Sequence, residues 1–173
     1  MEILENRQAW EDHFKANWLA HYEETGETNW KLYQYSKNEE APSGKAIDLS
    51  QSKLLFVTSS GAYLKDSQEA FDAPELLGDY TVRTFPQSTD LGDIAFAHEH
   101  YNHQYVDQDP QSVLPLRLLE TMQSEGIIGE LAETVVSFHG YTPIVTRVID
   151  ETIPQIISIA KEQNVDAALL VPV

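Results

Sequence analysis

Aromatic side chains recur every four residues near the start of the chain. They are Trp10, Phe14, Trp18 and Tyr22. This spacing puts them on one face of a helix, so residues 3–24 are predicted to form an amphipathic helix that Gly26 ends. We expect the aromatic face to pack against the body of the protein. The alternative is that this face binds a partner protein.

Short apolar runs separated by polar turns dominate the chain after residue 52. Residues 36–52 are polar and show no periodicity, so they are predicted to be a linker, and the compact domain is expected to begin near Lys53. The apolar runs have the length and the β-branched content of strands. The predicted strands are 54–58, 80–85, 94–97, 135–138 and 166–173.

Helical segments separate several of these strands. One is predicted to start at Pro115 and to end at Gly126. A longer one is predicted to open with Thr142 as N-cap and Pro143 as first residue. It should kink or restart at Pro154, which has no N–H to donate to the preceding turn.

The final run, residues 166–173, is apolar after its first residue. Such a run is typical of a parallel strand covered on both faces, so we expect it inside the sheet. The alternation of strands and helices predicts an α/β fold, with a three-layer, mostly parallel open sheet of Rossmann or flavodoxin type. Residues 1–52 would be the N-terminal helix and linker and 53–173 the α/β domain, together one compact unit.

The chain is strongly acidic. Its 28 acidic and 11 basic residues give a net charge of -17, and the acids are spread evenly along the 173 residues. A negative surface repels the phosphates of nucleic acids and of anionic membranes, so neither is an expected partner. The charge has two open interpretations, which are solubility and attraction to a basic partner protein.

Localisation and redox chemistry are constrained by what the sequence lacks. No apolar run approaches the roughly 20 residues that cross a bilayer, and the N-terminus has no basic and apolar regions of a signal peptide. A cytoplasmic protein is therefore expected. The 173 residues include no cysteine, so they supply no thiol nucleophile.

Three histidines lie within six residues after the predicted strand 94–97. They are His98, His100 and His103. They could bind substrate or handle protons, form structural hydrogen bonds, or hold a divalent metal. The spacing resembles the ligand run of metallo-β-lactamase-type hydrolases, but Asn102 stands where that run has an aspartate, so we expect no tightly bound metal.

Two more polar segments follow predicted strands. Ser59, Ser60 and Gly61 form either a tight turn or an anion-binding nest, and no glycine-rich nucleotide fingerprint is present. His139 follows strand 135–138. Because parallel strands end at one rim of a sheet, these segments should meet there. The residues expected at that rim are Ser60, Gly61, His98, His100, His103, His139 and Val173.

Six stretches, taken in order, resemble the glycine/betaine/sarcosine/D-proline reductase selenoprotein B family. They are Val57–Lys65, His98–Tyr101, Asp109–Leu116, Glu125–Leu131, Phe138–Tyr141 and Val165–Val173. The similarity covers residues 53–173, and Gln111 stands where the family pattern leads us to expect asparagine. The resemblance implies a subunit that cleaves the C–N bond of a small amino acid reductively, with a dithiol as donor. It also implies a partner subunit, which carries a pyruvoyl group in some complexes.

In this family a selenocysteine, or in some members a cysteine, attacks the substrate directly after the Leu-Leu-x-Pro-Val strand. That position would follow Val173, so the resemblance implies that the chain as given holds no catalytic residue or cofactor and is inactive. An in-frame UGA codon read as a stop is the expected cause; a deliberate cut at this point, or a natural loss of the catalytic tail, would give the same sequence. The alternatives are a non-catalytic interaction subunit of the same fold and a metal-binding hydrolase built on the histidine cluster. A homo-oligomer is compatible with each.

Overall fold

The computed structural model of the protein describes residues 3–40, 43–44, 46–99 and 101–173. The chain divides into two compact units, Met1–Lys45 and Ala46–Val173, and each is considered by itself. None of the helices in the described ranges is long and apolar enough to cross a membrane.

The N-terminal unit is built on the predicted helix. Its segments are α1 (Arg7–Phe14), a π-helical turn (Lys15–Leu19) and α2 (Ala20–Thr25). The helix ends at Gly26, whose φ of 71° is left-handed, which confirms the predicted stop. It begins later than expected, because Asn6 has a φ of 55° and turns the chain away from helical geometry.

The aromatic face of this helix forms a small core within its own unit. Trp10 and Phe14 stack with ring centroids 5.1 Å apart, and Phe14 stacks on Trp18 at 5.3 Å. A 3-10 turn (Trp30–Leu32) returns the chain, and the ring of Tyr33 meets that of Trp18 edge-on at 6.2 Å. The side chain of Trp18 is fully buried. Residues from the same unit therefore contribute to covering the aromatic face.

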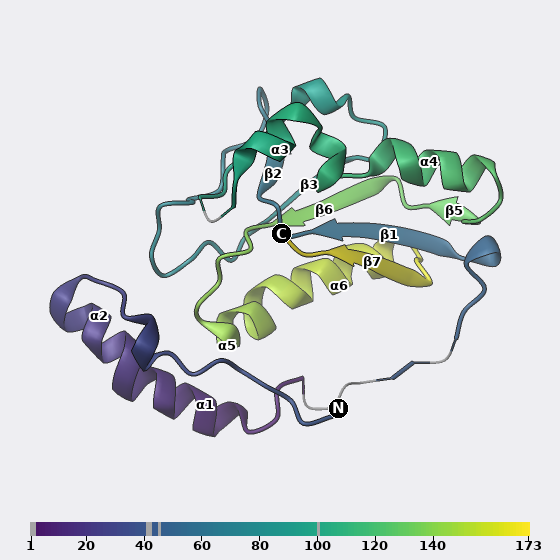
Figure 1. The fold of residues 1–173 in the computed structure, drawn as a ribbon. Coiled ribbons are helices and arrows are strands. Elements are labelled where there is room, and N and C mark those ends of the chain that lie inside the picture. The colour runs from purple at the N-terminus through teal and green to yellow at the C-terminus, as the bar shows by residue number, and fades with distance from the viewer. Residues whose placement is uncertain (1–2, 41–42, 45, 100) are drawn as a thin grey trace. The chain divides into compact units, whose positions relative to one another are not determined.

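The second unit is organised by a five-stranded, mostly parallel open sheet, which confirms the predicted fold class (Figure 1). Strand β1 (Lys53–Thr58) is parallel to β5, β6 and β7, while β3 is antiparallel to β6. The other strands are β3 (Val82–Pro86), β5 (Glu130–Leu131), β6 (Thr134–Phe138) and β7 (Ala167–Val171).

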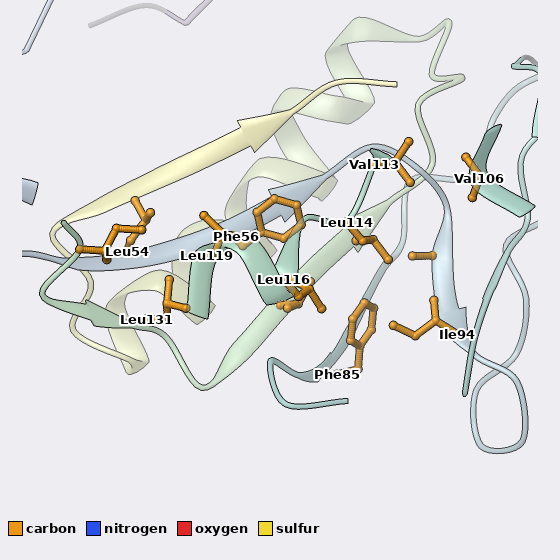
Figure 2. Close-up of a cluster of buried hydrophobic side chains, with 13 residues drawn as sticks. Leu54, Phe56, Phe85, Ile94, Val106, Val113, Leu114, Leu116, Leu119 and Leu131 are labelled. Carbon is orange, nitrogen blue, oxygen red and sulfur yellow. The ribbon is translucent and has the colours of Figure 1, made fainter. Parts of the chain in front are cut away.

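Helices cover both faces of this sheet. On one face, Leu116 and Leu119 of α4 (Leu116–Ser124) join Leu54 and Phe56 in the larger core (Figure 2). On the other, α6 (Ile153–Glu162) packs its half-buried residues on the smaller core, which includes Leu55 and Val57. Successive residues of β1 alternate between the two cores. This is why β1 reads as a continuous apolar run.

One predicted strand lies outside the main sheet. The strand predicted at 94–97 is β4 (Ile94–Phe96), and it pairs antiparallel with β2 (Ala62–Leu64) in a separate two-stranded sheet, so its predicted place in the parallel sheet was wrong. The cause is Gly61, whose φ of 69° turns the chain off β1 and lets β2 form. A β-carbon on Gly61 would lie 2.3 Å from the carbonyl oxygen of Ala97.

The predicted full burial of the last strand was also wrong. Among the described residues, β7 pairs with β1 alone, from Leu54↔Ala167 to Thr58↔Val171. Leu170 is 65% exposed, whereas Leu169 is partly buried in the larger core. An apolar composition is thus compatible with a strand covered on one face only.

The long C-terminal helix passes through a π-helical turn just before Pro154, where a kink or a restart was predicted. A short helix α5 (Val145–Arg147) and a π-helical turn (Val148–Thr152) precede α6, which carries Pro154 in its first turn. The helix begins later than predicted, with Ile144 as N-cap, because the Ile144 N–H donates to the Tyr80 hydroxyl oxygen at 2.7 Å.

Candidate functional site

Three segments meet beyond the carboxyl ends of β1 and β6. Ser60 follows β1, His139 follows β6, and the two residues form an antiparallel bridge. His98 comes from the loop after β4. Ser60 and His139 are fully buried, and His98 is 5% exposed.

The two buried imidazoles face each other. The ring centroids of His98 and His139 are 4.6 Å apart with the planes tilted by 40°. The Nδ1 atom of His139 lies 3.3 Å from the carbonyl oxygen of Tyr141, and the ring of Phe71 lies 6.3 Å from that of His139. Apolar and backbone groups thus hold the imidazole pair in an enclosed position.

Tyr101 links the histidines to the β1 turn. Its hydroxyl donates to the carbonyl oxygen of Ser60 at 3.2 Å, and its ring lies 4.7 Å from that of His98. Burial, with a smaller contribution from Asp107, raises the pKa of the Tyr101 phenol to about 12. The phenol therefore stays a neutral hydrogen-bond donor across the physiological pH range.

His103 closes the cluster from α3 (His103–Gln108). Its ring stacks on that of Tyr101 at 4.6 Å, and its Nε2 atom donates to the carbonyl oxygen of His98, which can only accept. Asn102 is the N-cap of α3, because its side-chain oxygen accepts from the N–H of Gln104 at 3.0 Å. The residue that suggested a metal-ligand position thus starts a helix.

The Ser59–Gly61 segment forms no regular turn, since Ser60 is bridged to His139, and its backbone is also not free to act as an anion nest. The three backbone N–H groups that would form a nest already donate within the protein. That of Ser59 donates to the Val171 carbonyl at 3.2 Å, and that of Ser60 to the Thr58 hydroxyl at 3.2 Å. That of Gly61 donates to the Phe138 carbonyl at 3.0 Å. No amide of this segment is left for an anion.

The end of β7 reaches the same rim. The N–H of Val173 donates to the Ser59 hydroxyl oxygen at 2.9 Å. Gly140 lies between this contact and the histidines, since a β-carbon there would be 2.9 Å from His98 Nε2 and 3.0 Å from the Ser59 carbonyl oxygen. The structure therefore brings together nearly all the residues expected at the rim. They are Ser60, Gly61, His98, His103, His139 and Val173.

Residues outside this set also lie in the site. His100 lies outside the described residues. Ser59, Tyr101 and Gly140 were not predicted as site residues, although each lies in a stretch that carries the family resemblance or next to a predicted member. In the described parts of the chain no three His, Cys, Asp or Glu side chains are grouped to hold a metal. The metal alternative needs His100, so it stays a prediction.

The arrangement suits proton handling. An imidazole gives up or accepts a proton near neutral pH, and two of them in contact can share that task. The Tyr101 phenol contributes a donor that stays protonated. The neighbouring apolar cavity of about 390 Å³, lined by Val57, Ser59, Phe138, Leu170, Val171 and Pro172, borders the same rim.

Comparison with known proteins gives a consistent set of relatives. The D-proline reductase subunit gamma of Acetoanaerobium sticklandii is 29% identical over 123 residues, covering 71% of this chain and 49% of that protein. The glycine reductase complex component B subunit gamma of Peptoclostridium acidaminophilum is 32% identical over 108 residues, covering 61% and 24%. The sarcosine reductase complex component B subunit beta of the same organism is 32% identical over 101 residues, covering 57% and 23%.

The chain therefore spans about half the length of the first of these relatives and about a quarter of the other two. No solved structure matches it, so the Rossmann or flavodoxin comparison stays a prediction. The family model for glycine/sarcosine/betaine reductase selenoprotein B matches residues 23–172, which is most of the chain. The chain belongs to this selenoprotein B family.

Proposed function

We propose that this chain is part of a reductase subunit that cleaves the C–N bond of a small amino acid, with a dithiol as electron donor. Support comes from the family and from relatives whose names assign them to D-proline, glycine and sarcosine reductases. The proposal includes a cytoplasmic complex with a partner subunit, pyruvoyl-containing in some cases, and with no cofactor in this chain.

The reaction balances with two electrons and two protons from the dithiol. The C–N bond breaks and its electron pair leaves with the nitrogen, which takes up one proton. The carbon gains the other proton and two electrons as a new C–H bond, and the dithiol becomes a disulfide. A selenocysteine or cysteine at the position after Val173 would attack the carbon first.

The observation that carries the proposal is the contact of His98 with His139, whose centroids are 4.6 Å apart, at the rim that the end of β7 reaches. An imidazole there would give the departing nitrogen its proton, while the rest of the cluster orients the substrate. Ser60, Gly61, His103 and the undescribed His100 complete the proposed set.

The test begins with the gene. The proposal expects the frame to continue through UGA after the Val173 codon into a segment with a second cysteine. The protein is then made through that frame with cysteine at the UGA position, and turnover of glycine, sarcosine, betaine and D-proline is measured with the partner subunit and a dithiol. We expect slow turnover of one of them, because a thiolate is a weaker nucleophile than a selenolate.

Histidine variants separate the roles. His98→Gln and His139→Gln should each lower kcat by about 10²–10⁴-fold, the usual contribution of general acid–base catalysis. His13→Gln is the matched control, because His13 is exposed in the N-terminal unit. An ordinary stop codon with no frame beyond it, or full activity in both site variants, would overturn the proposal and favour a non-catalytic interaction subunit.

A further inference from the structure

Ser59 binds the end of β7 through two different groups. Its N–H donates to the Val171 carbonyl oxygen at 3.2 Å, which continues the regular parallel ladder beyond the Thr58↔Val171 pair. The next bond of such a ladder would run from the Val173 N–H to the carbonyl oxygen of Ser59. The Val173 N–H instead donates to the Ser59 hydroxyl oxygen at 2.9 Å. A side chain thus replaces the backbone acceptor at the last step of the ladder.

The carbonyl oxygen of Ser59 points to a different neighbour. It lies 3.0 Å from where a β-carbon of Gly140 would be, and the Ser59 hydroxyl oxygen lies 3.3 Å from that point. The Nε2 atom of His98 is 2.9 Å from the same point. Only a residue without a side chain fits there, so Ser59 and His98 approach each other across the backbone of Gly140.

The acceptor of the bond from Val173 is buried, while Val173 itself is 36% exposed. Ser59 is 8% exposed and lines the apolar cavity with Val57, Leu170 and Pro172. Water competes weakly for a hydrogen bond in such surroundings. Pro172 has no N–H, so the next backbone donor after that of Val171 is the Val173 N–H.

We infer that Ser59 is a positioning residue, whose hydroxyl fixes Val173 beside the His98–His139 pair and thereby aims whatever group follows Val173 at the imidazoles. This inference rests on the proposed function, because it gives the reactive residue that position. Without the hydroxyl, β7 keeps its ladder up to Val171 and the last two residues lose their anchor.

Amide exchange in the 173-residue chain tests the anchor without any activity. Ser59→Ala should speed exchange of the Val173 amide about three- to tenfold, the effect of losing one hydrogen bond. Ser59→Thr, which keeps a hydroxyl, should restore slow exchange. The control is Ser137→Ala, since Ser137 is buried as Ser59 is, but its hydroxyl has no hydrogen-bond partner among the described residues. Equal exchange in Ser59→Ala and the native chain would overturn the inference.

The reactivity of the thiol in the cysteine-extended protein tests whether Ser59 directs the residue after Val173 toward the imidazoles. The midpoint of the alkylation rate against pH should shift when His98 is changed to Gln, and this shift should vanish in the Ser59→Ala background. A shift that persists without the hydroxyl would reduce Ser59 to a structural role and overturn the inference. If the coupling is present but the extended protein turns over no substrate, the anchor stands and the proposed reductase function fails.

Discussion

Gly140 is the residue across which Ser59 and His98 approach each other. A β-carbon there would lie 2.9 Å from His98 Nε2 and 3.0 Å from the Ser59 carbonyl oxygen. We expect Gly140→Ala to destabilise the protein by about 1–3 kcal/mol, because overpacking forces its neighbours to move. Urea denaturation measures the loss. Gly44→Ala is the control, since nothing lies within 4 Å of its added carbon, and an equal loss there would contradict the steric explanation.

Tyr101 makes the free energy of unfolding depend on pH in the alkaline range. Burial raises the pKa of its phenol to about 12 in the folded protein, against about 10 for a free phenol. The folded state therefore holds the proton more tightly, and this contribution is present below about pH 10 and lost as the pH rises to about 12. The free energy of unfolding should fall less steeply over that range in Tyr101→Phe than in the native protein.

The matched control for that measurement is Tyr105→Phe, because Tyr105 is 67% exposed on α3. Its denaturation should follow the native slope between about pH 10 and 12. Identical slopes for Tyr101→Phe and the native protein would show that the buried phenol does not titrate late.

The sequence pattern predicted which residues belong to the site, but it did not predict the contacts that they make. His139 follows β6 of the main sheet, so its place at the rim could be read from the chain. His98 reaches the same rim from β4, which lies in the separate two-stranded sheet, so that rule did not apply to it. The role of Asn102 could not be read from the chain, because an asparagine that caps a helix and one at a metal-ligand position give the same local sequence pattern. Ser59 and Tyr101 act through backbone atoms of Val173 and Ser60, and the sequence carries no signal for such contacts.

At the scale of elements, β1 and β7 are both apolar but differ in what covers them. Leu55 in β1 is fully buried, whereas Leu170 in β7 is 65% exposed. Leu55→Ala should therefore cost about 2–5 kcal/mol of unfolding free energy, which is the usual loss for a buried leucine. Leu170→Ala should change it by no more than about 0.5 kcal/mol. Chemical denaturation of both variants checks this, and comparable losses would show that the described chain buries Leu170 after all.

The errors in the predicted sheet have the same physical origin. A run of apolar residues shows that a strand forms, but it shows neither its neighbours nor whether both faces are covered. β4 was therefore assigned to the wrong sheet, and β7 was expected to be buried on both faces. Pairing depends on the turn at Gly61 and on helices that pack later in the chain. By contrast, β1 and β6 follow from local composition and were predicted correctly, and the α-helix changes to a π-helical turn just before Pro154.

Across the whole molecule the dominant feature is charge. The acids number ten in residues 1–50, ten in 51–110 and eight in 111–173, so like charges meet throughout the surface. Ion pairs oppose this repulsion, for example Arg147 with Glu151 at 2.6 Å and Lys53 with Glu130 at 2.6 Å. Exposed pairs of this kind contribute about 0–1 kcal/mol each. With a net charge of -17, repulsion should exceed their attraction.

Salt should therefore stabilise this protein. Raising the NaCl concentration to about 1 M shortens the Debye length to about 3 Å, which screens the repulsion between exposed carboxylates. We expect the melting temperature to rise by about 2–4 °C for each kcal/mol of repulsion removed. A double variant, Asp66→Asn with Glu133→Gln, neutralises two exposed acids. Its melting temperature at low salt should be higher than that of the native protein and should rise less when salt is added. A melting temperature that falls with salt in both proteins would mean that ion pairs, and not the excess of acids, control stability.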